Sequence, residues 1–141
     1  MSNDASDFAR SMSIATSGLR AQAGRMRLIS ENIANADSTA LTAGGEPYRR
    51  KIPSFTSALD RSLDAKVVSL GKVRTDQSAF RVKNEPGNPA ADPLGNVKYP
   101  NVNPLIEMTD MREAQRSYEA NLNIISATRR MIQRTLDILK A

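Results

Sequence analysis

Mostly apolar residues recur at alternating spacings of four and three near both ends of this 141-residue chain, and this pattern constrains the fold most. The first series is Phe8, Met12, Ala15, Leu19, Gln22, Met26, Ile29, Ile33 and Ala36. The second series is Met108, Met111, Gln115, Tyr118, Leu122, Ile125, Arg129, Ile132, Leu136 and Leu139. A sustained alternation of this kind places side chains along one line of an α-helix, as in a coiled-coil seam. The sequence therefore predicts two long helices that pack along these lines.

Residues that interrupt helices are confined to the middle of the chain. All seven prolines lie between Pro47 and Pro104. Asn103 followed by Pro104 is typical of an N-cap and the first residue of a helix. We therefore predict a mainly α fold in which a helix within residues 1–36 and a helix within 105–141 form a coiled-coil domain. Residues 37–104 form a smaller, irregular and partly β middle segment.

The middle segment carries weaker signals. Phe55, Leu59 and Leu63 are spaced by four residues, which predicts a short helix after Pro53. The stretches VVSLGKVR and SAFRVK are rich in β-branched residues, which predicts two short strands or a hairpin. The stretch from Asn84 to Pro104 contains so many prolines that we expect turns there and no core element.

The C-terminal series has a second apolar row beside it. Ile124, Met131 and Ile138, with Ala120 and Ala127, widen the apolar surface beyond a single seam. A helix that is apolar on more than one side needs more than one neighbour. The sequence leaves open whether the two long helices pair within one chain or between chains.

Charged residues at helical spacing predict ion pairs on the outer helix surfaces. Arg27 and Glu31 are four residues apart, and Arg116 lies three residues from both Glu113 and Glu119. Pairs at these spacings stabilise a helix by a few tenths of a kcal/mol, roughly 0.2–0.5 each. We interpret them as features of a solvated surface.

Composition excludes many kinds of active site. The chain has no cysteine and no histidine, so disulfides, thiolate nucleophiles, Cys/His metal sites and imidazole catalysis are excluded. It also lacks a phosphate-binding glycine loop and a nucleophile elbow. We therefore expect a protein that is not an enzyme and has no catalytic, metal or cofactor site.

The formal charge of +5 raises the question of nucleic-acid binding. The excess is spread along the chain, with +1 in residues 1–36, +3 in 37–104 and +1 in 105–141. The densest cluster, Arg49, Arg50 and Lys51, is interpreted as a solvated or partner-facing loop. The chain begins without a recognisable cleaved signal and has no apolar run of about 20 residues that could span a bilayer.

Two segments resemble the ends of bacterial flagellar rod proteins. They are SGLRAQAGRMRLISENIANADST, from Ser17 to Thr39, and YPNVNPLIEMTDMREAQRSYEANLNIISATRRMIQRTLDIL, from Tyr99 to Leu139. The linking ADPLGNVKYPNVNP and the short chain resemble proximal rod proteins of the FlgC type in particular. The family's helix-ending signature is matched loosely by Asn32, Ala34, Asn35, Ser38 and Thr39, together with Ala36 and Asp37. Asp37 and Ser38 depart from the commonest form of this signature.

The resemblance implies a structural subunit of the proximal rod, in the periplasmic part of the flagellar basal body. Such a subunit is exported by the flagellar type III apparatus without a cleaved signal, polymerises by helix packing and transmits motor torque. Its implied partners are copies of itself, other rod proteins, the adaptor at the membrane ring and the export apparatus, with no nucleic acid and no small-molecule substrate. The predicted assembly seam is Leu19, Met26, Ile29, Ile33, Tyr118, Leu122, Ile125, Ile132, Leu136 and Leu139.

Two other functions are kept as alternatives. A basic coiled coil that binds nucleic acid would lose affinity steeply with salt. A secretion adaptor or chaperone would be a folded dimer, whereas we expect the ends of an isolated rod subunit to be poorly ordered.

Overall fold

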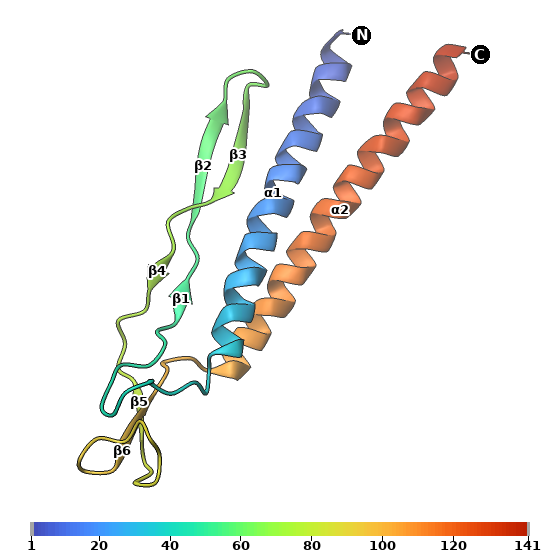
Figure 1. The fold of residues 1–141 in the computed structure, drawn as a ribbon. Coiled ribbons are helices and arrows are strands. Elements are labelled where there is room, and N and C mark those ends of the chain that lie inside the picture. The colour runs from blue at the N-terminus through green and yellow to red at the C-terminus, as the bar shows by residue number, and fades with distance from the viewer. Residues whose placement is uncertain (1, 141) are drawn as a thin grey trace. The chain divides into compact units, whose positions relative to one another are not determined.

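The computed structural model describes residues 2–140 and contains two long helices separated by six short strands (Figure 1). The helices are α1 (Ser2–Ala34) and α2 (Pro104–Lys140). The strands are β1 (Lys51–Ile52), β2 (Phe55–Asp60), β3 (Ala65–Leu70), β4 (Arg74–Thr75), β5 (Arg81–Asn84) and β6 (Asn96–Tyr99). The predicted mainly α fold, with two long terminal helices and a small β-containing middle, is confirmed.

The chain divides into two compact units, and both helices contribute to each. The first unit contains residues 2–26, 54–72 and 113–140, and the second contains residues 27–53 and 73–112. In each unit the two helices of the same chain lie against one another in antiparallel directions. The question of pairing within one chain is thus answered by contacts such as Asn32 with Glu107 in the second unit.

Small residues let α1 and α2 approach closely in the first unit. A Cβ atom added at Gly18 would lie 2.8 Å from Oδ1 of Asn121. Ala15 on α1 and Ala114 on α2 are almost completely buried. Glycine lowers helix propensity by about 1 kcal/mol relative to alanine, so Gly18 is explained by the close approach of the neighbouring helix.

Residues 55–60 form strand β2, so the short helix predicted after Pro53 is wrong. Strand β2 pairs with β3 in an antiparallel hairpin that places Phe55 opposite Leu70 and Asp60 opposite Ala65. Apolar residues four apart fit a strand of period two as well as a helix. The β-branched residues Val67 and Val68 favour a strand and lie in β3, and pairing with β3 makes residues 55–60 a strand and not a helix.

The β2–β3 hairpin is attached to α1 by polar contacts. Arg10 Nε donates to the carbonyl of Leu63 at 2.6 Å, and the amide of Val68 donates to Oγ of Ser17 at 3.2 Å. Farther along, a Cβ atom at Gly24 would lie 2.9 Å from Cδ2 of Leu70. One side of α1 in this unit is therefore covered by the hairpin.

The second unit has its core in the proline-rich stretch, where the sequence predicted none. Strand β6 pairs with β5, and Ala90, Val97 and Tyr99 form a buried cluster. The Tyr99 hydroxyl donates to Oε2 of Glu85 at 2.8 Å. The turns between Asn84 and Pro104 fold the chain back so that its few apolar side chains meet. The two predicted strand regions overlap β3 and β5, and these strands pair with β2 and β6 and not with each other.

The start of α2 is capped as predicted. Asn103 Oδ1 accepts a hydrogen bond from the amide of Leu105 at 3.1 Å, and the Asn103 carbonyl accepts one from the amide of Glu107. Pro104 is the first residue of the helix. At the other boundary, α1 ends at Ala34, two residues before the last position of the predicted series.

Replacing Asn103 with alanine should lower the free energy of unfolding by about 1 kcal/mol, because the first turn of α2 loses its side-chain acceptor. Urea unfolding followed by circular dichroism measures this change. Asn103→Asp is the matched control and should retain most of the stability. Equal stability of the alanine variant and the unaltered chain would contradict the capping role.

Candidate assembly surface

Several contacts between the two helices lie one residue before positions of the predicted series. In the first unit the contacts involve Gly18 with Asn121, and Arg25 with Glu113 through an ion pair of 3.3 Å. Seven contact or buried positions each lie one residue before a position of the predicted series. They are Gly18, Arg25, Asn32, Glu107, Ala114, Asn121 and Thr128. The series positions that follow them are Leu19, Met26, Ile33, Met108, Gln115, Leu122 and Arg129. Small or polar side chains thus occupy the contact, and larger apolar ones lie beside it.

A step of one residue rotates a side chain by about 100° around the helix axis. Because α1 and α2 are antiparallel, such a step on both helices moves the side chains to the same side of the pair. Leu19 and Met26 of α1 therefore share one side with Leu122 of α2. We call this surface of the first unit the lateral face and define it by Leu19, Met26, Tyr118, Leu122 and Leu136.

The predicted seam residues differ widely in burial. Ile29 is buried between the helix ends of the second unit, and Ile33 is half-buried in that unit. In the first unit Leu19, Met26, Tyr118, Ile125 and Ile132 are half-buried, whereas Leu122, Leu136 and Leu139 are 41%, 45% and 59% exposed. The structure thus brings part of the predicted seam together on the lateral face and leaves Leu122, Leu136 and Leu139 of α2 exposed.

A buried polar network joins the helix ends in the second unit. Asn32 Nδ2 donates to Oε2 of Glu107 at 3.1 Å and to the Lys51 carbonyl at 2.9 Å. Asn32 Oδ1 accepts from the Tyr48 hydroxyl at 2.8 Å and from the Lys51 amide at 2.9 Å. Arg50 Nε donates to Oε1 of Glu107 at 2.5 Å. Every polar atom of the Asn32 amide group is therefore used to fix the end of α1.

The two central residues of this network are buried. Glu107 and Asn32 are both 1% exposed, and a buried carboxylate is tolerated only with partners such as Arg50. Burial, followed by the negative charges of Glu31 and Glu107, raises the pKa of Tyr48 to about 12, so its hydroxyl stays protonated as a donor. Glu107 lies in the first turn of α2, where the helix dipole favours any acidic residue, so its position in the sequence does not reveal its buried partners.

The basic cluster at Arg49, Arg50 and Lys51 is engaged within the chain. Arg50 forms its ion pair with Glu107, and Lys51 forms one with Glu31. The Arg49 guanidinium lies 4.1 Å from the centre of the Phe80 ring. The interpretation of this cluster as a solvated or partner-facing loop did not include these contacts within the chain.

Ion pairs also form between elements in place of those expected along single helices. Glu31 pairs with Lys51 in place of Arg27, and Glu113 pairs with Arg25 in place of Arg116. The charged residues of α1 thus help to connect it to its neighbours in each unit.

The signature residues form the exit from α1. Ala34 is the last residue of the helix, and Asn35 Nδ2 donates to the carbonyl of Glu31 at 2.9 Å. Ser38 Oγ donates to the carbonyl of Asn35, also at 2.9 Å, and Thr39 is half-buried. With Asn32 in the buried network, these residues set where the helix stops.

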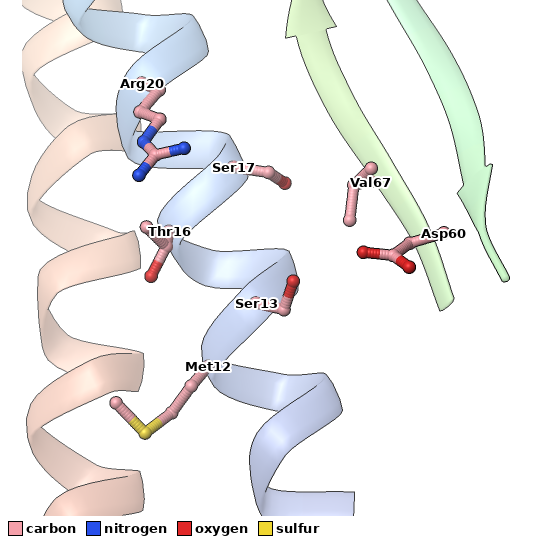
Figure 2. Close-up of a pocket in the computed structure, with 7 residues that line it drawn as sticks. All are labelled: Met12, Ser13, Thr16, Ser17, Arg20, Asp60 and Val67. Carbon is pink, nitrogen blue, oxygen red and sulfur yellow. The ribbon is translucent and has the colours of Figure 1, made fainter. Parts of the chain in front are cut away.

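A groove of about 360 Å³ lies between α1 and the hairpin of the first unit (Figure 2). Its lining residues are Met12, Ser13, Thr16, Ser17, Arg20, Asp60 and Val67. Asp60 points toward α1 and accepts hydrogen bonds from Ser62, which hold the pKa of its carboxyl below the usual value. No hydrogen bond in the described part of the chain joins this carboxylate to a groove hydroxyl, so the lining residues form no nucleophile–base pair.

Among residues 2–140, no three Asp or Glu side chains are grouped so as to hold a metal ion. Within the same range, neither helix is long and apolar enough to cross a membrane.

Replacing Glu107 with alanine should lower the free energy of unfolding by about 3 kcal/mol, because Arg50 and Asn32 lose a buried partner. Glu113→Ala is the matched control. It removes a carboxylate that is 67% exposed, and it should change stability by less than about 1 kcal/mol. Urea unfolding of both variants measures the difference, and equal losses would contradict the importance of the buried network.

Two family models match the chain. Residues 12–40 match the family described as flagella basal body rod protein, and residues 94–138 match the C-terminal family of flagellar basal body rod FlgEFG proteins. The first match contains most of α1 and the exit from it, and the second contains β6 and most of α2.

Known proteins are similar over nearly the whole chain. The flagellar basal-body rod protein FlgC of Agrobacterium fabrum is 54% identical over 91% of this chain and 92% of its own length. The FlgC proteins of Bacillus subtilis and Aquifex aeolicus are 38% and 36% identical, over 92% and 95% of this chain and 97% and 98% of their own lengths. The resemblance seen in the sequence is confirmed, and the chain belongs to the FlgC family of flagellar basal-body rod proteins.

Proposed function

We propose that this protein is a structural subunit of the proximal rod that polymerises by helix packing and transmits motor torque. Membership of the FlgC family supports the rod assignment. The observation that carries the packing mechanism is the apolar lateral face, which the chain leaves partly uncovered.

Burial of the exposed leucines of the lateral face would favour the association of subunits. Leu122 and Leu136 are 41% and 45% exposed, on a helix whose contact with α1 uses Ala114 and Asn121. Fully burying a leucine side chain contributes about 1.5–3 kcal/mol. A row of such residues along a helix is suited to a helix of a neighbouring subunit, packed in the manner of a coiled coil.

The proposed role is mechanical and not catalytic. The relatives carry the name of rod proteins, and the chain has neither cysteine nor histidine. A shaft that transmits torque needs subunits held by many packed side chains, because close-packed protein interiors have low compressibility. Head-to-tail contacts that do not close into a ring would extend such packing into a helical assembly.

The remaining partners and the location follow from the same proposal. The subunit would contact its own copies, other rod proteins and the adaptor at the membrane ring. It would reach the periplasm through the flagellar export apparatus without a cleaved signal.

The nucleic-acid alternative loses its main support. Arg50 and Lys51 of the densest basic cluster already form ion pairs with Glu107 and Glu31. Phosphate contacts would have to compete with these carboxylates. No contact described here specifically favours the alternative of a secretion adaptor.

Leu122→Asp should abolish rod assembly and swimming, because it places a charge in a surface that must become dry. Asn123→Asp is the matched control, since it adds the same charge one residue farther along α2, where the side chain points about 100° away. Swimming in soft agar and recovery of the protein in purified basal bodies measure the effect.

Both variants should keep the circular dichroism of the unaltered chain, because position 122 is already 41% exposed and Asn123 is exposed as well. Normal swimming of the Leu122→Asp strain, with the variant present in its basal bodies, would rule out the lateral face as an assembly surface.

A further inference from the structure

Arg81 of strand β5 joins three segments of the second unit. Its Nε donates to the carbonyl of Pro100 at 3.1 Å, and one of its terminal nitrogens donates to the carbonyl of Ala36 at 2.8 Å. The same terminal nitrogen lies 3.5 Å from Oδ1 of Asp37. One guanidinium thus connects β5 with the turn that follows α1 and with the segment that leads into α2.

Both of these carbonyl groups belong to buried residues. Ala36 is 3% exposed, and the side chain of Pro100 is fully buried. Among residues 2–140, Arg81 is the only donor found for either carbonyl. A buried carbonyl that loses its donor destabilises the segment that carries it. Removal of this guanidinium would therefore affect both segments at once.

Helix α1 has no basic residue in its own last turn. A cation near the C-terminal end of a helix is favoured by the helix dipole, and it can donate hydrogen bonds to the last carbonyls. Arg81 brings such a cation from 45 positions away in the sequence. The local hydrogen bond from Asn35 to Glu31 marks where the helix stops. Arg81 adds a contact that ties the following turn to the rest of the unit.

Asp37 departs from the commonest form of the helix-ending signature, and it lies beside Arg81. The two side chains are 79% and 42% exposed. Exposed ion pairs contribute little stability. The two buried carbonyls therefore carry most of the effect of Arg81, and Asp37 adds a weaker contact.

The shape of a guanidinium suits this position. Its donors are fixed in one planar fork, so the two carbonyls that they contact are held at a set separation. A lysine ammonium is a compact charge on a flexible stem. Lysine would supply the positive charge near the end of α1 but would not set this separation.

We propose that Arg81 is a positioning residue that holds the exit from α1 against the segment leading into α2. It acts through the carbonyls of Ala36 and Pro100. The proposal rests on the proposed rod function, because helices that pack between subunits need ends with fixed positions.

Hydrogen exchange of backbone amides, followed by NMR on the purified full chain, tests this proposal. The amide of Ser38 donates to the carbonyl of Asn35 in the exit turn. In Arg81→Ala this amide should exchange about tenfold faster, because the turn opens more often. The amides that join β5 to β6 should keep their exchange rates. A general loss of stability would instead accelerate both groups alike.

Lys83→Ala is the matched control. It removes the same charge from the same strand, and the Lys83 ammonium lies 4.7 Å from the centre of the Tyr99 ring. This variant should leave the exchange of Ser38 unchanged. Arg81→Lys keeps the charge and should still accelerate Ser38, because the planar fork is lost. Equal rates in Arg81→Lys and the unaltered chain would overturn the proposal, since charge alone would then suffice.

Two other results would also overturn it. One is an Arg81→Ala chain in which Ser38 is not accelerated, or is accelerated no more than the amides of the β5–β6 pair. The other is an unprotected Ser38 amide in the unaltered chain, because the exit would then not be held at all. The rod function would survive each of these results, whereas failure of the unaltered chain to enter basal bodies would overturn the rod function itself.

Discussion

The contact between α1 and α2 is made by small and polar side chains, and most other features of the structure follow from this. Gly18 on α1 lies against Asn121 on α2, and Ala15 on α1 and Ala114 on α2 are buried in the same unit. Because this strip is occupied by small residues, the leucines, isoleucines and methionines of the heptad pattern lie on either side of it. A close intramolecular contact thus leaves apolar side chains exposed on two sides of it.

The buried network of the second unit complements this contact. Asn32 and Glu107 align the end of α1 with the start of α2, and Arg50 neutralises the buried carboxylate. A shift of either helix by one residue would separate these groups and leave polar atoms buried without partners. In the second unit this network therefore sets the register of the helix pair, a task that small apolar residues perform poorly because they fit many registers.

The sequence was sufficient to predict the two helices and the cap at Asn103, and it also marked the apolar row Ile124, Met131 and Ile138, which the structure leaves exposed. It did not distinguish the strip that meets α1 from the strip one residue along, because hydrophobicity marks leucine as the contact and does not reveal the close approach that Gly18 permits. The helix predicted over Phe55 and Leu59 failed because local spacing fits both periods, whereas the pairing of β2 with β3, in which Phe55 lies opposite Leu70 and Leu59 opposite Lys66, is a longer-range interaction. Similarly, the partner of Glu107 lies 57 positions away and has no local signal.

Methionine oxidation measured by mass spectrometry tests the central claim, that neighbouring subunits cover surfaces left bare by a single chain. Met131 is 49% exposed in the chain, and its thioether should react with hydrogen peroxide when the purified protein is free in solution. In intact rods the account predicts that Met131 is protected several-fold. Equal oxidation of Met131 in the free chain and in assembled rods would contradict it.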